Sequence, residues 1–161
     1  MRKLIVLALL ATAASLSGCR GYTQVRPFRS DIKTVYVQAF DNRTFRRGLE
    51  VPLTRAIEDE IKRRTPFLFA SKDRADSILS GELTDFQERT QIRSEDDVVL
   101  LTRVSATVRF RWRDRLTGAD IVPEQTVRES ARLFEDVEAT LHDLAFQEVA
   151  KRVVEHMQEP W

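Results

Sequence analysis

Cysteine, glycine and histidine are scarce in this chain of 161 residues, which contains one cysteine, five glycines and two histidines. A single cysteine excludes an internal disulfide and leaves no set of thiolates for a structural zinc site. Five glycines leave little room for a glycine-rich loop that cradles phosphates. The 26 basic and 25 acidic residues nearly cancel, so the overall charge gives no reason to expect a nucleic-acid partner.

The one cysteine stands at an informative position, because it closes an apolar N-terminal stretch. Arg2 and Lys3 provide a basic start, and the apolar run after them leads into Leu16-Ser17-Gly18-Cys19. This layout is typical of a secretory signal peptide, with small residues running into a cysteine where an Ala-x-Ala box usually stands. We predict a lipoprotein signal peptide over residues 1–18 and lipidation of Cys19. The alternative is a signal peptide without lipidation that ends near a buried cysteine.

Long apolar runs are otherwise missing. No other segment approaches the roughly 18 apolar residues that a membrane-spanning helix needs, so we expect the body of the protein to be soluble. Residues 19–31 are polar with few apolar positions, and Pro27 interrupts regular structure. We interpret them as the lipidated N-terminus and a short tether, followed by a single domain over residues 32–161.

The spacing of apolar residues predicts four strands and two helices. In one of the strands, Phe86 departs from the parity of the apolar residues before it, which predicts a bulge near Asp85. The run Phe67-Leu68-Phe69 fits either a small strand or a packed loop. The predicted strands cover residues 32–40, 78–93, 98–113 and 124–133, and the predicted helices run from about 49–52 to 65 and from 137 to 157.

This order of elements indicates the fold class. Sequential strands joined by short turns pair antiparallel, and a strand followed by a helix packs that helix on the sheet. We therefore predict an α/β (α+β) fold, a two-layer sandwich with two helices packed on one face of a four-stranded, mostly antiparallel sheet. The other face of the sheet would be polar and rich in arginine.

The strand predicted over residues 98–113 alternates most clearly. Its even positions are mainly apolar, whereas its odd positions carry Arg103, Arg109, Arg111 and Arg113, so one face is basic. Arginine pairs bidentately with phosphate and carboxylate groups, and such a face could recognise phosphorylated or acidic lipid sugars. A solvated face paired with Asp and Glu of neighbouring strands is the alternative.

Signals for catalysis or metal binding are weak. His142 and His156 lie on one predicted helix, where fourteen residues correspond to a rise of about 21 Å, so they cannot bind one metal ion. The acidic residues occur as contiguous clusters, which on a helix or turn spread over different faces. We therefore predict no catalytic residue, no cofactor and no metal site.

Several motifs appear in an order that resembles a known family. Gly21-Tyr22 follows Cys19, a predicted strand ends in Phe40-Asp41-Asn42-Arg43-Thr44, and the next helix opens with Gly48-Leu49-Glu50 and continues as Leu53-Thr54-Arg55-Ala56-Ile57. This order resembles the lipopolysaccharide-assembly lipoprotein family (LptE) over residues 19–62. The remainder agrees in its order of strands and helices.

The resemblance implies an outer-membrane lipoprotein that faces the periplasm and whose α/β domain plugs a large β-barrel, the LptD-like lipopolysaccharide-assembly protein. In that family the plug helps the barrel to assemble and takes part in delivering lipopolysaccharide to the outer leaflet, without catalysis. Arg20 fits this location, because in enteric bacteria an aspartate at that position retains lipoproteins in the inner membrane. The family's lipopolysaccharide-contacting basic residues lie on its sheet, which makes Arg103, Arg109 and Arg111 candidates by placement.

A regulatory lipoprotein that faces the periplasm, similar to the activators of peptidoglycan synthases, is the alternative function. Such proteins carry a long disordered linker. Here only about a dozen residues separate Cys19 from the first predicted strand, which keeps the domain near the membrane and favours the plug.

Overall fold

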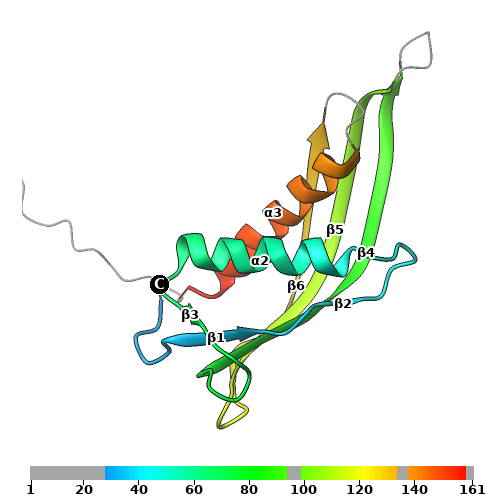
Figure 1. The fold of residues 1–161 in the computed structure, drawn as a ribbon. Coiled ribbons are helices and arrows are strands. Elements are labelled where there is room, and N and C mark those ends of the chain that lie inside the picture. The colour runs from blue at the N-terminus through cyan, green and yellow to red at the C-terminus, as the bar shows by residue number, and fades with distance from the viewer. Residues whose placement is uncertain (1–27, 94–98, 134–137, 159–161) are drawn as a thin grey trace, which may run out of the picture.

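Two helices cover one face of a six-stranded sheet in this computed structural model, which describes residues 28–93, 99–133 and 138–158 (Figure 1). The helices are α2 (Glu50–Arg64) and α3 (Glu138–His156). The strands are β1 (Thr34–Val37), β2 (Asp41–Asn42), β3 (Leu68–Phe69), β4 (Ser77–Arg93), β5 (Val99–Asp114) and β6 (Asp120–Leu133). In the part of the chain that the structure describes, neither helix is long and apolar enough to cross a bilayer.

The sheet is mixed. Its strands follow the order β3-β1-β4-β5-β6, and β2 pairs with β4 beside this path. The long strands β4, β5 and β6 are antiparallel, whereas β1 runs parallel to both β3 and β4. The predicted α+β two-layer fold is thus confirmed. The predicted number of four strands is wrong, because two further strands of two residues each join the sheet.

The first predicted strand, residues 32–40, is divided in two. Residues 34–37 form β1 and residues 41–42 form β2. Between them the backbone N–H of Phe40 donates to Oγ1 of Thr54 on α2, at 3.0 Å, so at this point the chain bonds to the helix layer.

The pairing of β4 with β5 contains the irregularity that the sequence predicts. Its register shifts between Leu83 and Asp85, in agreement with the bulge predicted near Asp85. Leu83 is fully buried under the helices. The shift therefore reverses which parity of β4 faces the core over the remaining residues of the strand.

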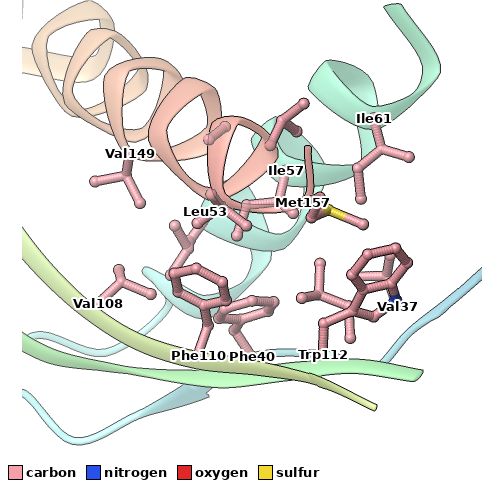
Figure 2. Packing of buried hydrophobic residues seen from close by; sticks show 14 of the residues in the cluster. Val37, Phe40, Leu53, Ile57, Ile61, Val108, Phe110, Trp112, Val149 and Met157 are labelled. Atoms are coloured by element: carbon pink, nitrogen blue, oxygen red, sulfur yellow. The ribbon is translucent and has the colours of Figure 1, made fainter. Parts of the chain in front are cut away.

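The core fills the space between the helices and the sheet (Figure 2). Trp112 and Phe110 rise from β5, Phe40 comes from the chain after β1, and Leu53 and Ile57 descend from α2; each is at most 2% exposed. Burying a large apolar side chain contributes about 1.5–3 kcal/mol. The core thus fixes the helices to one face and leaves the other face of the sheet open.

Candidate functional site: the arginine face of the sheet

The open face of the sheet follows from the alternation along β5. Val104, Val108 and Trp112 have no exposed surface and pack under the helices. Successive side chains of a strand point to opposite faces, so the odd positions of β5 lie on the face away from the helices. The predicted basic face therefore exists, and Arg103, Arg109 and Arg111 lie on it.

Three arginines stand side by side across this face. In the register of the sheet, Arg103 of β5 is directly opposite Arg89 of β4 on one side and Arg132 of β6 on the other. Residues that are directly opposite share a face, and like charges in that relation destabilise a sheet. We call Arg89, Arg103 and Arg132 the arginine row.

The row has little internal compensation. Arg89 donates to Oε1 of Gln87 at 3.2 Å, and among the described residues no carboxylate forms a salt bridge with any member of the row. The Nε atom of Arg103 is buried without a hydrogen-bond partner in the same part of the chain. Because a buried donor without a partner costs free energy, this position favours an external acceptor.

A shallow hollow of about 410 Å³ lies along the row. Hydroxyl and amide groups share its lining with arginines, and the nearest carboxylate, that of Glu129, is engaged by Arg152 of α3 at 3.0 Å. Such a set of donors suits an anionic group with several oxygens. The residues that line the hollow are Gln87, Arg89, Arg103, Ser105, Arg128, Glu129 and Ser130.

Arg109 is in a different situation. Its guanidinium lies 2.8 Å from Oε1 of Glu82 and 3.7 Å from Oε1 of Glu124. The hydrogen bond from Arg43 and the nearby charge of Arg109 hold the pKa of Glu82 below its usual range. Arg109 thus has the ion-paired surroundings that the alternative interpretation of the basic face predicts.

Arg111 is exposed and lines a second hollow, of about 350 Å³, together with Arg109 and Arg113. Six residues of strand separate Arg103 from Arg109, or about 20 Å. The structure therefore brings Arg109 and Arg111 together and sets Arg103 apart, in the row with Arg89 and Arg132.

The remaining predictions concern metals and lipidation. The described part of the chain holds no group of three or more His, Cys, Asp or Glu residues that could bind a metal ion. The Nδ1 atom of His156 donates to the carbonyl oxygen of Arg152 at 2.8 Å, while His142 lies 3.1 Å from Arg46 and stacks edge-on against Phe86. Cys19 lies outside the described residues.

Comparison with known proteins adds a family to this geometry. A family model named LptE, with the description lipopolysaccharide-assembly, matches residues 32–157. No curated protein matches the chain.

Among solved structures, the PelC dodecamer from Paraburkholderia phytofirmans is similar with a TM-score of 0.56 and 14% identity, covering 83% of this chain and 94% of that one. The hypothetical protein CT253 from Chlamydia trachomatis has a TM-score of 0.54 and 13% identity, with 78% and 98% covered. A minor lipoprotein from Acinetobacter baumannii has a TM-score of 0.51 and 11% identity, with 79% and 93% covered. At such low identity these likenesses concern the fold alone.

Proposed function

The chain belongs to the lipopolysaccharide-assembly family LptE, and from this we propose that it is an outer-membrane lipoprotein that plugs and helps to assemble the lipopolysaccharide-exporting β-barrel. In this role it assists delivery of lipopolysaccharide to the outer leaflet and performs no catalysis. The match over residues 32–157 covers both helices and every strand of the fold. The observation that supports the proposal is this match over the whole domain.

The proposed anchor is Cys19, on the periplasmic side of the outer membrane. Acyl chains contribute about 0.8 kcal/mol per buried CH₂ group, and stable anchoring needs more than one chain or a second membrane signal. We expect Cys19→Ser to move the protein out of the lipidated membrane fraction. Retention of the variant there, with an unmodified N-terminus by mass spectrometry, would contradict anchoring through Cys19.

The proposed contact with lipopolysaccharide is the arginine row. Lipopolysaccharide carries phosphate groups, and a guanidinium can donate two parallel hydrogen bonds to one phosphate. Arg103 contributes the central charge and a buried Nε donor that lacks a partner in the described chain, with Arg89 and Arg132 on either side. Ser105 and Ser130, directly opposite each other in the next row, add hydroxyl donors.

The matching experiment measures the affinity of the purified protein for lipopolysaccharide. Arg103→Gln removes the central charge and should weaken binding about tenfold or more, because a hydrogen bond to a charged group contributes about 1.5–3 kcal/mol. Arg55→Gln is the matched control, since Arg55 is exposed on α2. Dephosphorylated lipopolysaccharide should bind wild type and Arg103→Gln equally.

Unchanged affinity of Arg103→Gln for the phosphorylated lipid would remove the row from the proposed function. Charge reversal at Arg109 and Arg111 tests the other two candidates in the same assay. We expect a smaller loss at Arg109, because Glu82 and Glu124 already neutralise it.

The proposed partner is an LptD-like barrel. Crosslinking in intact cells followed by purification in detergent should recover the chain together with an outer-membrane barrel protein. Recovery with a peptidoglycan synthase would favour the regulatory alternative, and recovery of the chain alone would contradict the plug.

A further inference from the structure

The short strand β3 exposes two large apolar side chains at the edge of the sheet. Leu68 is 68% exposed and Phe69 is 38% exposed, and successive residues of a strand point to opposite faces. The edge therefore presents apolar surface on both sides. Native sheets usually protect their edges with charged residues, proline or a covering segment, so exposed apolar residues at this position indicate a surface that something covers.

Basic residues surround this edge. The ammonium group of Lys62 lies 5.3 Å from the centre of the Phe69 ring, and Arg63 and Arg64 follow it at the exposed end of α2. Lys33, exposed at the start of the neighbouring β1, adds a further positive charge. Long basic side chains beside aromatic and aliphatic groups are typical of segments that rest in a membrane interface.

The same end of the domain receives the N-terminal segment. Phe28, the first described residue, packs edge-on against Phe67 with ring centres 5.6 Å apart, and Phe67 directly precedes β3. The chain between Cys19 and Phe28 can extend over about 30 Å at most. A lipid on Cys19 therefore keeps β3 within about that distance of the bilayer.

A third exposed apolar residue lies at this end. Leu116 is 78% exposed in the turn between β5 and β6. The backbone N–H of Arg115 in this turn donates to the carbonyl oxygen of Asp76 at 2.9 Å, and Asp76 ends the loop that follows β3. Of the five large hydrophobic residues exposed in the described chain, Leu68, Phe69 and Leu116 thus gather where the tether begins.

We propose that the end of the domain formed by Leu68, Phe69 and the basic end of α2 rests on the anionic lipid surface of the membrane that holds the Cys19 anchor; the proposal rests on the anchor proposed above. The lipid surface is the one occupant that the short tether brings to this end at all times. Its negative headgroups complement Lys33, Lys62 and the neighbouring arginines, each such charge adding about 1 kcal/mol near an anionic surface.

This contact has a defined role in the proposed arrangement. A single flexible attachment through Cys19 leaves the domain free to rotate about its tether. A second contact at β3 fixes which end of the sheet faces the lipid and directs the long hairpin of β4 and β5, which extends from the other end (Figure 1), away from the anchor.

The test uses the full chain, processed in cells, purified in detergent and reconstituted in vesicles of phosphatidylcholine and phosphatidylglycerol without any other protein. Leu68→Cys introduces a thiol that an environment-sensitive fluorophore can label, because a lipidated Cys19 has no free thiol. Phe45→Cys is the matched control: Phe45 is fully exposed in the loop before α2, at the other end of that helix. Nitroxide-bearing lipids serve as quenchers.

We expect the label at Leu68 to shift its emission to shorter wavelength and to be quenched several-fold more strongly than the label at Phe45. Replacing phosphatidylglycerol by phosphatidylcholine should reduce the difference. Equal, weak quenching at both positions in a lipidated, vesicle-bound chain would overturn the lipid contact, leave the anchor intact and favour a protein partner on β3. Strong quenching at both positions would also overturn it, because the contact would not be specific to this end.

Failure of the anchor gives a separate signature. A chain whose Cys19 carries no lipid would bind two fluorophores in the Leu68→Cys variant, and mass spectrometry of its N-terminus would show a free thiol. Selective quenching at Leu68 in that chain would still support the lipid-facing edge, and its absence would overturn it.

Discussion

Asn42 holds Thr44 by two hydrogen bonds: its side-chain oxygen accepts the backbone N–H of Thr44 at 2.9 Å and the Thr44 hydroxyl at 2.7 Å. Its amide nitrogen donates to the carbonyl oxygen of Arg46 at 2.6 Å and to Oε2 of Glu50 at 3.1 Å. Both lone pairs and both hydrogens of the amide are thus used, and the loop between β2 and α2 is closed around one side chain.

This saturation predicts that Asn42→Asp destabilises the domain. The new carboxylate oxygen would face the carbonyl oxygen of Arg46 and the carboxylate of Glu50, where the amide donated. We expect the free energy of unfolding to fall by about 1–3 kcal/mol, measured by urea denaturation at neutral pH. Gln38→Glu adds the same charge at an exposed position and should change stability little; an equal loss in both variants would attribute the effect to charge alone.

The close packing of Gly81 against Phe40 gives a second prediction. A Cβ atom at Gly81 would meet the Phe40 ring and would lie 2.5 Å from the carbonyl oxygen of Arg109 on β5. Because backbone atoms cannot yield easily, Gly81→Ala should cost about 1–3 kcal/mol or more and lower the melting temperature. Gly118→Ala is the control: nothing lies within 4 Å of its Cβ position, and only its φ of +71° opposes the change. Equal losses would argue against the overpacking at Gly81.

The stability of the domain should depend on Asp76 in acid. Hydrogen bonds from the backbone N–H of Lys33 and from Thr34 hold the pKa of Asp76 below its ordinary value of 3.8. The unfolded chain therefore binds a proton more readily, and the stabilisation present above pH 3.8 is lost as the pH falls through the lower folded value.

We expect Asp76→Asn to flatten the fall in stability over this acidic range, measured as the urea midpoint against pH. Asp73→Asn, at an exposed position in the same loop, should keep the wild-type slope. A wild-type slope in Asp76→Asn would show that the bonds to Lys33 and Thr34 do not link folding to protonation.

The arginine row predicts that stability and binding change in opposite directions. Replacing Arg103 by glutamine removes the central member of three directly opposed charges, and cross-strand terms of this kind amount to about 0.2–1 kcal/mol. Arg103→Gln should therefore unfold at a slightly higher urea concentration than wild type at low salt, and this gain should shrink as salt screens the charges. A loss of stability at low salt would show that the row is compensated within the chain.

The sequence predicts those parts of the fold that repeat with a regular period. The alternation along β5 predicts both of its faces correctly, and the parity change at Phe86 locates the bulge. Pairing between distant segments leaves no such pattern: β2 and β3 have two residues each, too few to show a period. β6 begins at Asp120, before its predicted start at Glu124, because an edge strand tolerates Pro123.

The arginine face shows the same division. Arg103, Arg109 and Arg111 share a face because of a local period of two, which the sequence shows. Arg89 is missed, because by the parity of Leu79 and Leu83 it would point into the core, and only the bulge turns it to the open face. The carboxylates that neutralise Arg109 come from two other strands, so its ion pairs depend on the register of the whole sheet.

The parallel pairs of β1 have a consequence for the order in which the protein can form. Thr34 pairs with Leu68, and Val35 pairs with Ser77, so the first strand to be synthesised waits for segments made much later. Ribosomes add about 5–20 residues per second, and β1 therefore spends seconds without either neighbour. Its Val35 and Val37, buried in the finished domain, are exposed during that time. A chaperone that binds nascent or newly exported chains would find its earliest binding site at this strand, and would have to release it before the sheet can close.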